Sequence, residues 1–233
     1  MPNIYWTKNA IALIGPFGQS NFTNAREAAE SSSSTVNTTS SNVIASGFIR
    51  SSGRGGSAFG FRRSYYGFDF TGYTAGTITN LVFNYTPTTT STGTLSNRLA
   101  QFNGFGSALG SNYTDDDWWD SIADPLVPYS NAFNSADNST AADVALNSTA
   151  INDAKADGFL KLVLMNSTDY NNFNLAVDVS NTTNWNIGSQ STGKVFLSFD
   201  YSAPSSFADI NSVSEVQLSE VNGVSSWDEI NGV

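Results

Sequence analysis

The densest set of side chains that could do chemistry lies in a short segment near the middle of the chain. It combines adjacent carboxylates with two neighbouring indoles, namely Asp115, Asp116, Asp117, Trp118, Trp119 and Asp120. A glycoside hydrolase needs two carboxylates flanking a sugar, and aromatic faces beside them hold the sugar by stacking. Carboxylates also bind divalent cations, but this segment lacks the Asp-x-Asp-x-Asp-Gly spacing of a dedicated calcium loop. The residue types therefore leave glycan cleavage, glycan binding and metal binding open.

A purely structural role competes with all three. Carboxylates in the first turn of a helix stabilise its positive end, and the sequence predicts a short helix from Asp115 to Ala123 that is capped by Thr114. We favour this role, so we predict no catalytic residue, no enzyme activity and no cofactor. A glycan-cleaving enzyme stays as a second alternative, and weak metal candidates remain at Asp115, Asp116, Asp117 and Asp120.

Glycan binding is the better functional use of the aromatic residues. Flat aromatic faces with nearby Asn, Asp and backbone donors hold sugars, and the candidates for this are Tyr113, Trp118, Trp119, Tyr129 and Trp185. An aromatic side chain in a β-sandwich more often belongs to the core than to a binding platform. A carbohydrate-binding adhesion module is therefore the first alternative function, with a surface glycan as its partner.

The amino-acid composition excludes several classes of function. The chain has 233 residues with no His and no Cys, which rules out disulfides, Ser-His-Asp or Cys-His catalysis and the usual zinc sites. The net charge of −10 argues against a nucleic-acid partner, since phosphate binding needs a basic surface. We interpret the one basic cluster as a solvated strand face and loop, with contact to a phosphate or an acidic neighbour as the alternative; it comprises Arg50, Arg54, Arg62 and Arg63.

The sequence shows no sign of a membrane or secretory element. No apolar stretch is long enough to cross a bilayer, so no membrane partner is expected. The segment from Met1 to Trp6 lacks the basic start and apolar stretch of a secretory signal. We therefore expect synthesis in the cytoplasm without a signal peptide, followed by another export route or by packaging into a particle.

Alternating apolar residues predict the elements that must position these side chains. Period-2 alternation places one face of a strand on a core, and it occurs in five runs, at 66–70, 81–85, 160–164, 173–179 and 195–201. Such runs, separated by Gly, Ser, Thr and Asn, predict an all-β, antiparallel sandwich. Short helices are predicted at 25–30, at 115–123 and at 149–156, the last capped by Ser148 and closed by Gly158.

We divide the chain into three parts. Residues 1–35 form an N-terminal arm or edge strand with a short helix, residues 36–204 form the sandwich, and residues 205–233 form an acidic repeat tail. The tail repeats a short pattern at 210–213, 221–224 and 230–233. Asn-Gly between β-branched residues is a tight-turn signal, since both residues tolerate positive φ. The tail is therefore predicted to form small strand–turn units.

Units of this size cannot bury their own apolar side chains. Either the chain's own sandwich or another subunit must cover them, and we favour another subunit because a terminal extension reaches outward. The residues predicted to make this assembly contact are Ile210, Val213, Val221, Asn222, Gly223, Val224, Trp227, Ile230, Asn231, Gly232 and Val233.

The tail also carries a resemblance. Its "VNGV" and "EINGV" segments resemble short C-terminal repeats of virion structural proteins from tailed phages, although Ser212 replaces Gly in the first copy. The segment from Ala142 to Asn147, with the helix and strand after it, resembles jelly-roll domains of surface adhesins and phage structural proteins. The resemblance implies a jelly-roll-like decoration, neck or tail-fibre protein on the particle exterior, made in the host cytoplasm. Such a protein would assemble through its terminal extensions, with the N-terminal arm and the tail docking onto neighbouring subunits. Its partners would be other virion proteins, copies of itself and a host surface glycan.

Overall fold

The computed structural model describes residues 1–5, 11–14, 23, 42–53, 56–90, 96–102, 126–134, 141–171, 182–188 and 195–204. The chain divides into two units, Met1–Ser202 and Ala203–Val233. The elements below all belong to the first unit. The predicted helices at 25–30 and 115–123, the predicted strand at 173–179 and the tail at 205–233 lie outside the described residues.

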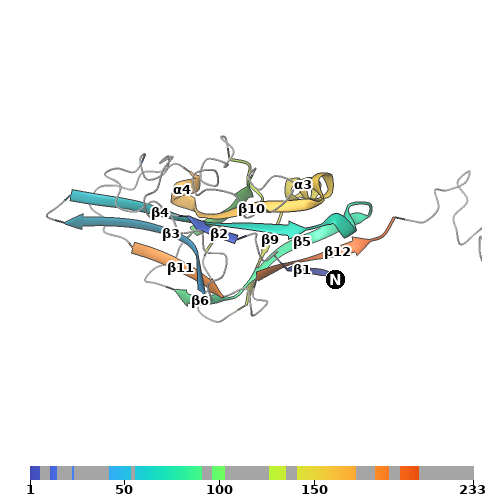
Figure 1. The fold of residues 1–233 in the computed structure, drawn as a ribbon, viewed down its shortest axis with the longest axis horizontal. Coiled ribbons are helices and arrows are strands. Elements are labelled where there is room, and N and C mark those ends of the chain that lie inside the picture. Colours follow the sequence, from blue (N-terminus) through green and yellow to red (C-terminus); the bar gives the residue numbers. More distant parts are fainter. Residues whose placement is uncertain are drawn as a thin grey trace, which may run out of the picture. The chain divides into compact units, whose positions relative to one another are not determined.

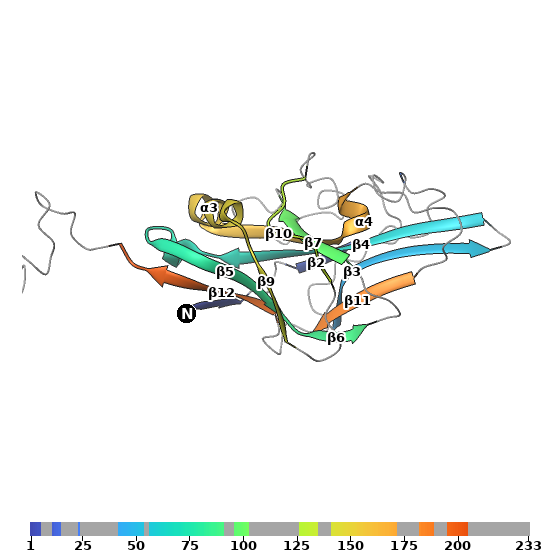
Figure 2. The same cartoon turned by 180° about the vertical axis from the view of Figure 1, so that it is seen from behind.

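Two antiparallel sheets make up this unit (Figures 1 and 2). The smaller sheet has the order β1 (Asn3–Tyr5), β12 (Val195–Ser202), β5 (Thr77–Tyr85) and β9 (Ala142–Ala145). The larger sheet has the order β6 (Pro87–Thr90), β11 (Thr182–Gly188), β3 (Asn42–Gly53), β4 (Gly56–Asp69), β10 (Phe159–Asn166), β7 (Ser96–Gln101) and β8 (Phe133–Asn134). An additional strand, β2 (Ile11–Ile14), pairs with β4. The predicted all-β, antiparallel sandwich is confirmed.

Eight strands pair in a nested order along the chain. β7 pairs with β8, β5 with β9, β4 with β10 and β1 with β12, so each pair encloses the one before it. A long hairpin folded in this way into two sheets is a jelly roll, with β1-β12-β5-β9 opposite β4-β10-β7-β8. β3, β11 and β6 extend the second of these sheets beyond β4.

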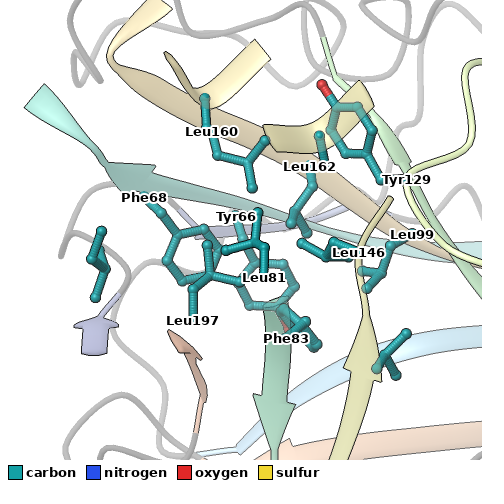
Figure 3. Packing of buried hydrophobic residues seen from close by; sticks show 14 of the residues in the cluster. Tyr66, Phe68, Leu81, Phe83, Leu99, Tyr129, Leu146, Leu160, Leu162 and Leu197 are labelled. Carbon is teal, nitrogen blue, oxygen red and sulfur yellow. The ribbon is translucent and has the colours of Figure 1, made fainter. Parts of the chain in front are cut away.

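The core lies between the two sheets (Figure 3). β4, β5, β10 and β12 supply the alternate residues that the sequence pattern predicts, and the buried side chains come from both sheets: Tyr66, Phe68, Leu160, Leu162 and Leu164 from the larger, and Leu81, Phe83, Tyr85, Val195, Leu197 and Phe199 from the smaller. Burying one such side chain contributes about 1.5–3 kcal/mol. This burial therefore fixes which face of each strand points inward.

Three short helices occur among the described residues: η1 (Thr71–Tyr73), α3 (Ser148–Asp157) and α4 (Ser167–Tyr170). Both α3 and α4 lie beside β10 (Figure 1). The prediction of Ser148 as the cap of α3 is wrong by one residue. The cap is Asn147, whose Oδ1 accepts a hydrogen bond from the Ala150 amide at 3.1 Å. Gly158 closes the helix with a φ of 65°, a left-handed conformation that glycine adopts without strain. In the described part of the chain, no helix has the length and apolarity to cross a membrane.

The N-terminal residues belong to the chain's own sheets. Ile4 pairs with Leu197 of β12 and is buried in the core, and Ile11 pairs with Tyr66 of β4. The edge-strand prediction is therefore confirmed for β1. Residues 11–14 also pair within this chain, as β2. The division of the chain at residue 35 stays a prediction.

Candidate functional site

A buried ion pair joins the middle of β4 to α4, the short helix that follows β10. Arg63 Nε donates to Asp169 Oδ2 at 2.6 Å, and Arg63 Nη2 donates to Asp169 Oδ1 at 2.7 Å. Both side chains are almost fully buried. Burial alone lowers the pKa of the Arg63 guanidinium, but the charge and hydrogen bonds of Asp169 outweigh this effect and leave the pKa raised. The guanidinium therefore stays charged, and the pair is held by two parallel hydrogen bonds.

This ion pair corrects the interpretation of the basic cluster. Arg63 is not on a solvated face; it contacts an acidic neighbour, which was the alternative. Arg50 and Arg62 lie on β3 and β4, where they pair with Phe59 and Gly47 through the backbone. Arg54 and the side chains of Arg50 and Arg62 lie outside what the structure describes.

Further polar contacts hold α4 against β7 and the end of β10. Asn166 Oδ1 accepts from the Thr168 amide at 2.6 Å and caps the helix. The hydroxyls of Ser96 and Ser167 are 2.8 Å apart, and the Arg98 guanidinium lies 4.7 Å from the centre of the Tyr170 ring. Both Asp169 oxygens accept hydrogen bonds from Arg63. The cluster holds a helix on a sheet.

Tyr129 lies in a second polar cluster, at the edge of the core (Figure 3). Its hydroxyl donates to Asp153 Oδ2 at 2.7 Å, and Gln101 Nε2 donates to the same oxygen at 3.0 Å. The Tyr129 residue is only 1% exposed. A ring this deeply buried cannot stack on a sugar. The prediction of Tyr129 as a glycan-binding residue is therefore wrong. Its role is to join the loop before β8 to α3.

The other predicted site residues are placed only in part. Trp185 lies on β11, where its backbone pairs with Ser46 and Thr90, and its side chain is not described. Outside the described residues lie the aromatic candidates Tyr113, Trp118 and Trp119, the metal candidates Asp115, Asp116, Asp117 and Asp120, and the assembly residues from Ile210 to Val233. Within the described part, no group of three acidic side chains is close enough to hold a metal ion.

Two buried tyrosines should make the protein sensitive to alkali. Burial raises the pKa of Tyr66, and burial together with the Asp153 carboxylate raises the pKa of Tyr129. Since both folded pKa values exceed the unfolded value of about 10, the stability they support is complete below about pH 10 and falls as the pH rises further. In an absorbance titration, both phenols should ionise only with unfolding. A Tyr66→Phe/Tyr129→Phe variant should lose less stability than the wild type as the pH rises above about 10; an equal loss would contradict this prediction.

The structure also reveals a surface that the sequence did not single out. Four side chains stand in one row on the outer face of the smaller sheet, because Tyr5 pairs with Phe196, Phe196 with Asn84, and Asn84 with Asp143. Their neighbours on each strand point into the core. Alternation predicted the outward side of β5 and β12, but the registers that align four strands come from distant parts of the chain.

Comparison with known proteins adds no relative. No protein-family model matches the chain, and no curated protein matches it.

Proposed function

We propose that this protein is a structural component of a tailed-phage virion, a decoration, neck or tail-fibre protein that assembles through its tail. The resemblance of the tail to virion repeats supports this proposal. So does the character of the described polar clusters, each of which ties one element of the sandwich to another. A rigid sandwich with an acidic surface suits a particle exterior that is exposed to solvent and salt.

One structural observation carries the proposal: the strand that leads into the tail lies inside its sheet. β12 is hydrogen-bonded to β1 on one side and to β5 on the other. Its inward side chains, Val195, Leu197 and Phe199, are buried in the core. A pull on the tail therefore acts on a central strand, which cannot peel away as an edge strand can.

The end of β12 is in close contact with Gly76. Gly76 packs so closely against Tyr201 and Ser202 that a Cβ atom at position 76 would overlap the Tyr201 ring and the Ser202 carbonyl. This contact helps to position the last two residues of β12. We assign docking to the tail, through the residues from Ile210 to Val233.

Removal of residues 205–233 tests the proposal. The deletion leaves every described core residue in place, so the truncated protein should fold and unfold as the full chain does, as measured by circular dichroism. Supplied to assembling particles together with the full-length protein, it should be absent from purified virions. A full-length Val221→Ser/Val224→Ser variant is a second test that keeps the length of the tail, and it should be incorporated less than the wild type. Normal incorporation of the truncated protein would contradict the proposal.

A further inference from the structure

The outer face of the smaller sheet presents a regular array of side chains to solvent. The first row is Tyr5, Phe196, Asn84 and Asp143, and the second is Asn3, Ser198, Val82 and Ala145. The end positions of both rows are exposed, and the central ones are partly exposed. Tyr5 is 53% exposed. Neighbouring strands lie about 4.8 Å apart, so each row spans about 14 Å.

One end of the first row is aromatic. The Tyr5 and Phe196 rings lie 5.5 Å apart between centres, at an interplanar angle of 42°. The face of an aromatic ring carries partial negative charge and attracts C–H groups. An exposed ring pair on a flat sheet therefore suits a ligand that has an apolar face.

The other end of the row offers hydrogen-bond acceptors. Asn84 Nδ2 donates to Ser198 Oγ at 2.8 Å and also lies near the carbonyl oxygens of Val82 and Phe196. These contacts fix the amide orientation and leave Oδ1 as an acceptor without a protein partner among the described residues. The Asp143 carboxylate, next in the row, is exposed and likewise accepts no hydrogen bond there. The ligand must therefore supply hydrogen-bond donors beside its apolar face.

The charge of this face narrows the choice of ligand. β1, β12, β5 and β9 contain no Lys or Arg, and their two charged residues are Asp143 and Asp200. Phosphates and acidic polysaccharides are repelled by such a surface. A purely apolar partner would bury Asn84 and Asp143 without hydrogen bonds, which is costly.

A ligand with an apolar face, donors along its rim and no negative charge is a neutral sugar. The aromatic rings and the Asp143 carboxylate stand at opposite ends of the row, too far apart for one guanidinium or ammonium group to use both. A short oligosaccharide lying across the strands spans this distance. We propose that the outer face of β1, β12, β5 and β9 binds a neutral oligosaccharide, with Tyr5 and Phe196 stacking and Asn84 and Asp143 accepting from hydroxyl groups.

The test uses the full chain in solution and does not depend on particle assembly. Maltohexaose, cellohexaose, chitohexaose, xylohexaose and mannohexaose are each titrated against the protein by calorimetry and by NMR. At least one should bind with a Kd in the millimolar range. Tyr5→Ala should weaken that binding about tenfold, and Asp143→Asn should also weaken it. Asp157→Asn changes an exposed carboxylate on α3 and should have no effect.

Three results would overturn the proposal. The first is that none of the five oligosaccharides binds at a concentration of about ten times the millimolar Kd. The second is that binding is unchanged in both Tyr5→Ala and Asp143→Asn. The third is that an arginine-rich peptide binds this face while the oligosaccharides do not, which would identify a basic protein as the partner. A failed glycan titration leaves the assembly test of the tail unaffected, so the two proposals fail separately.

Discussion

Replacing Asp169 with alanine should lower the free energy of unfolding by about 3–5 kcal/mol, because it leaves the Arg63 guanidinium buried without its counter-charge. Both hydrogen bonds of the pair are shorter than 2.8 Å, and Arg63 is only 4% exposed, so water cannot replace the lost carboxylate without opening the structure. Urea unfolding followed by tryptophan fluorescence measures the loss. The expected result is a lower midpoint with an unchanged slope.

A double variant distinguishes the effect of the unpaired charge from the effect of lost packing. Arg63→Leu/Asp169→Leu removes both charges and keeps apolar volume at both positions, so it should recover most of the stability lost in Asp169→Ala. Asp157→Ala, which removes an exposed carboxylate from α3, should leave the urea midpoint unchanged. Equal destabilisation by the single and double variants would show that the charge on Arg63 is not the cause.

Replacing Phe83 with alanine should cost about 3–5 kcal/mol. The Phe83 ring is fully buried and projects from the smaller sheet towards two rings of the larger one, with centres 5.6 Å from Tyr66 and 6.5 Å from Phe68. Its removal would leave a cavity between the sheets at the centre of the core (Figure 3). The loss can be measured by urea unfolding or as a drop in Tm.

The matched control for Phe83 is another phenylalanine in the same sheet. Phe196 stands on the outer face of β12, where it is partly exposed, so Phe196→Ala should destabilise the protein much less. Phe83→Leu keeps most of the apolar volume and should cost less than Phe83→Ala. A loss for Phe196→Ala as large as that for Phe83→Ala would mean that the outer face is also part of a packed interior.

Much of the fold follows from local patterns in the sequence. The inward faces of β4, β5, β10 and β12 are those that period-2 alternation predicts, because each side chain's direction depends only on its own strand. The nested pairing is not local. β1 meets β12, and β4 meets β10, through contacts between residues far apart in the chain, and nothing in either strand's own sequence specifies its partner.

The contacts of the polar residues are also between distant parts of the chain, and the sequence alone does not predict them. The sequence gives Arg63 the appearance of a surface cation among other arginines, whereas its partner Asp169 lies 106 positions away. From the sequence alone, Tyr129 is a candidate for stacking on a sugar. The structure shows instead that its hydroxyl donates to Asp153, which also accepts from Gln101. The outer row of the smaller sheet is composed of unremarkable residues, and it becomes a candidate site only when three strand registers align them. The assembly role of the tail stays a prediction.

The pairing of β1 with β12 also constrains how the chain acquires its structure. Asn3 lies opposite Ser198, a separation of 198 − 3 = 195 positions. During synthesis, the first strand must wait for nearly all of the sandwich to leave the ribosome before its partner exists. Such non-local closure makes folding slow, and meanwhile the side of Ile4 that will be buried is open to other nascent chains. Chaperone dependence and a low yield at high expression temperature should therefore accompany this architecture.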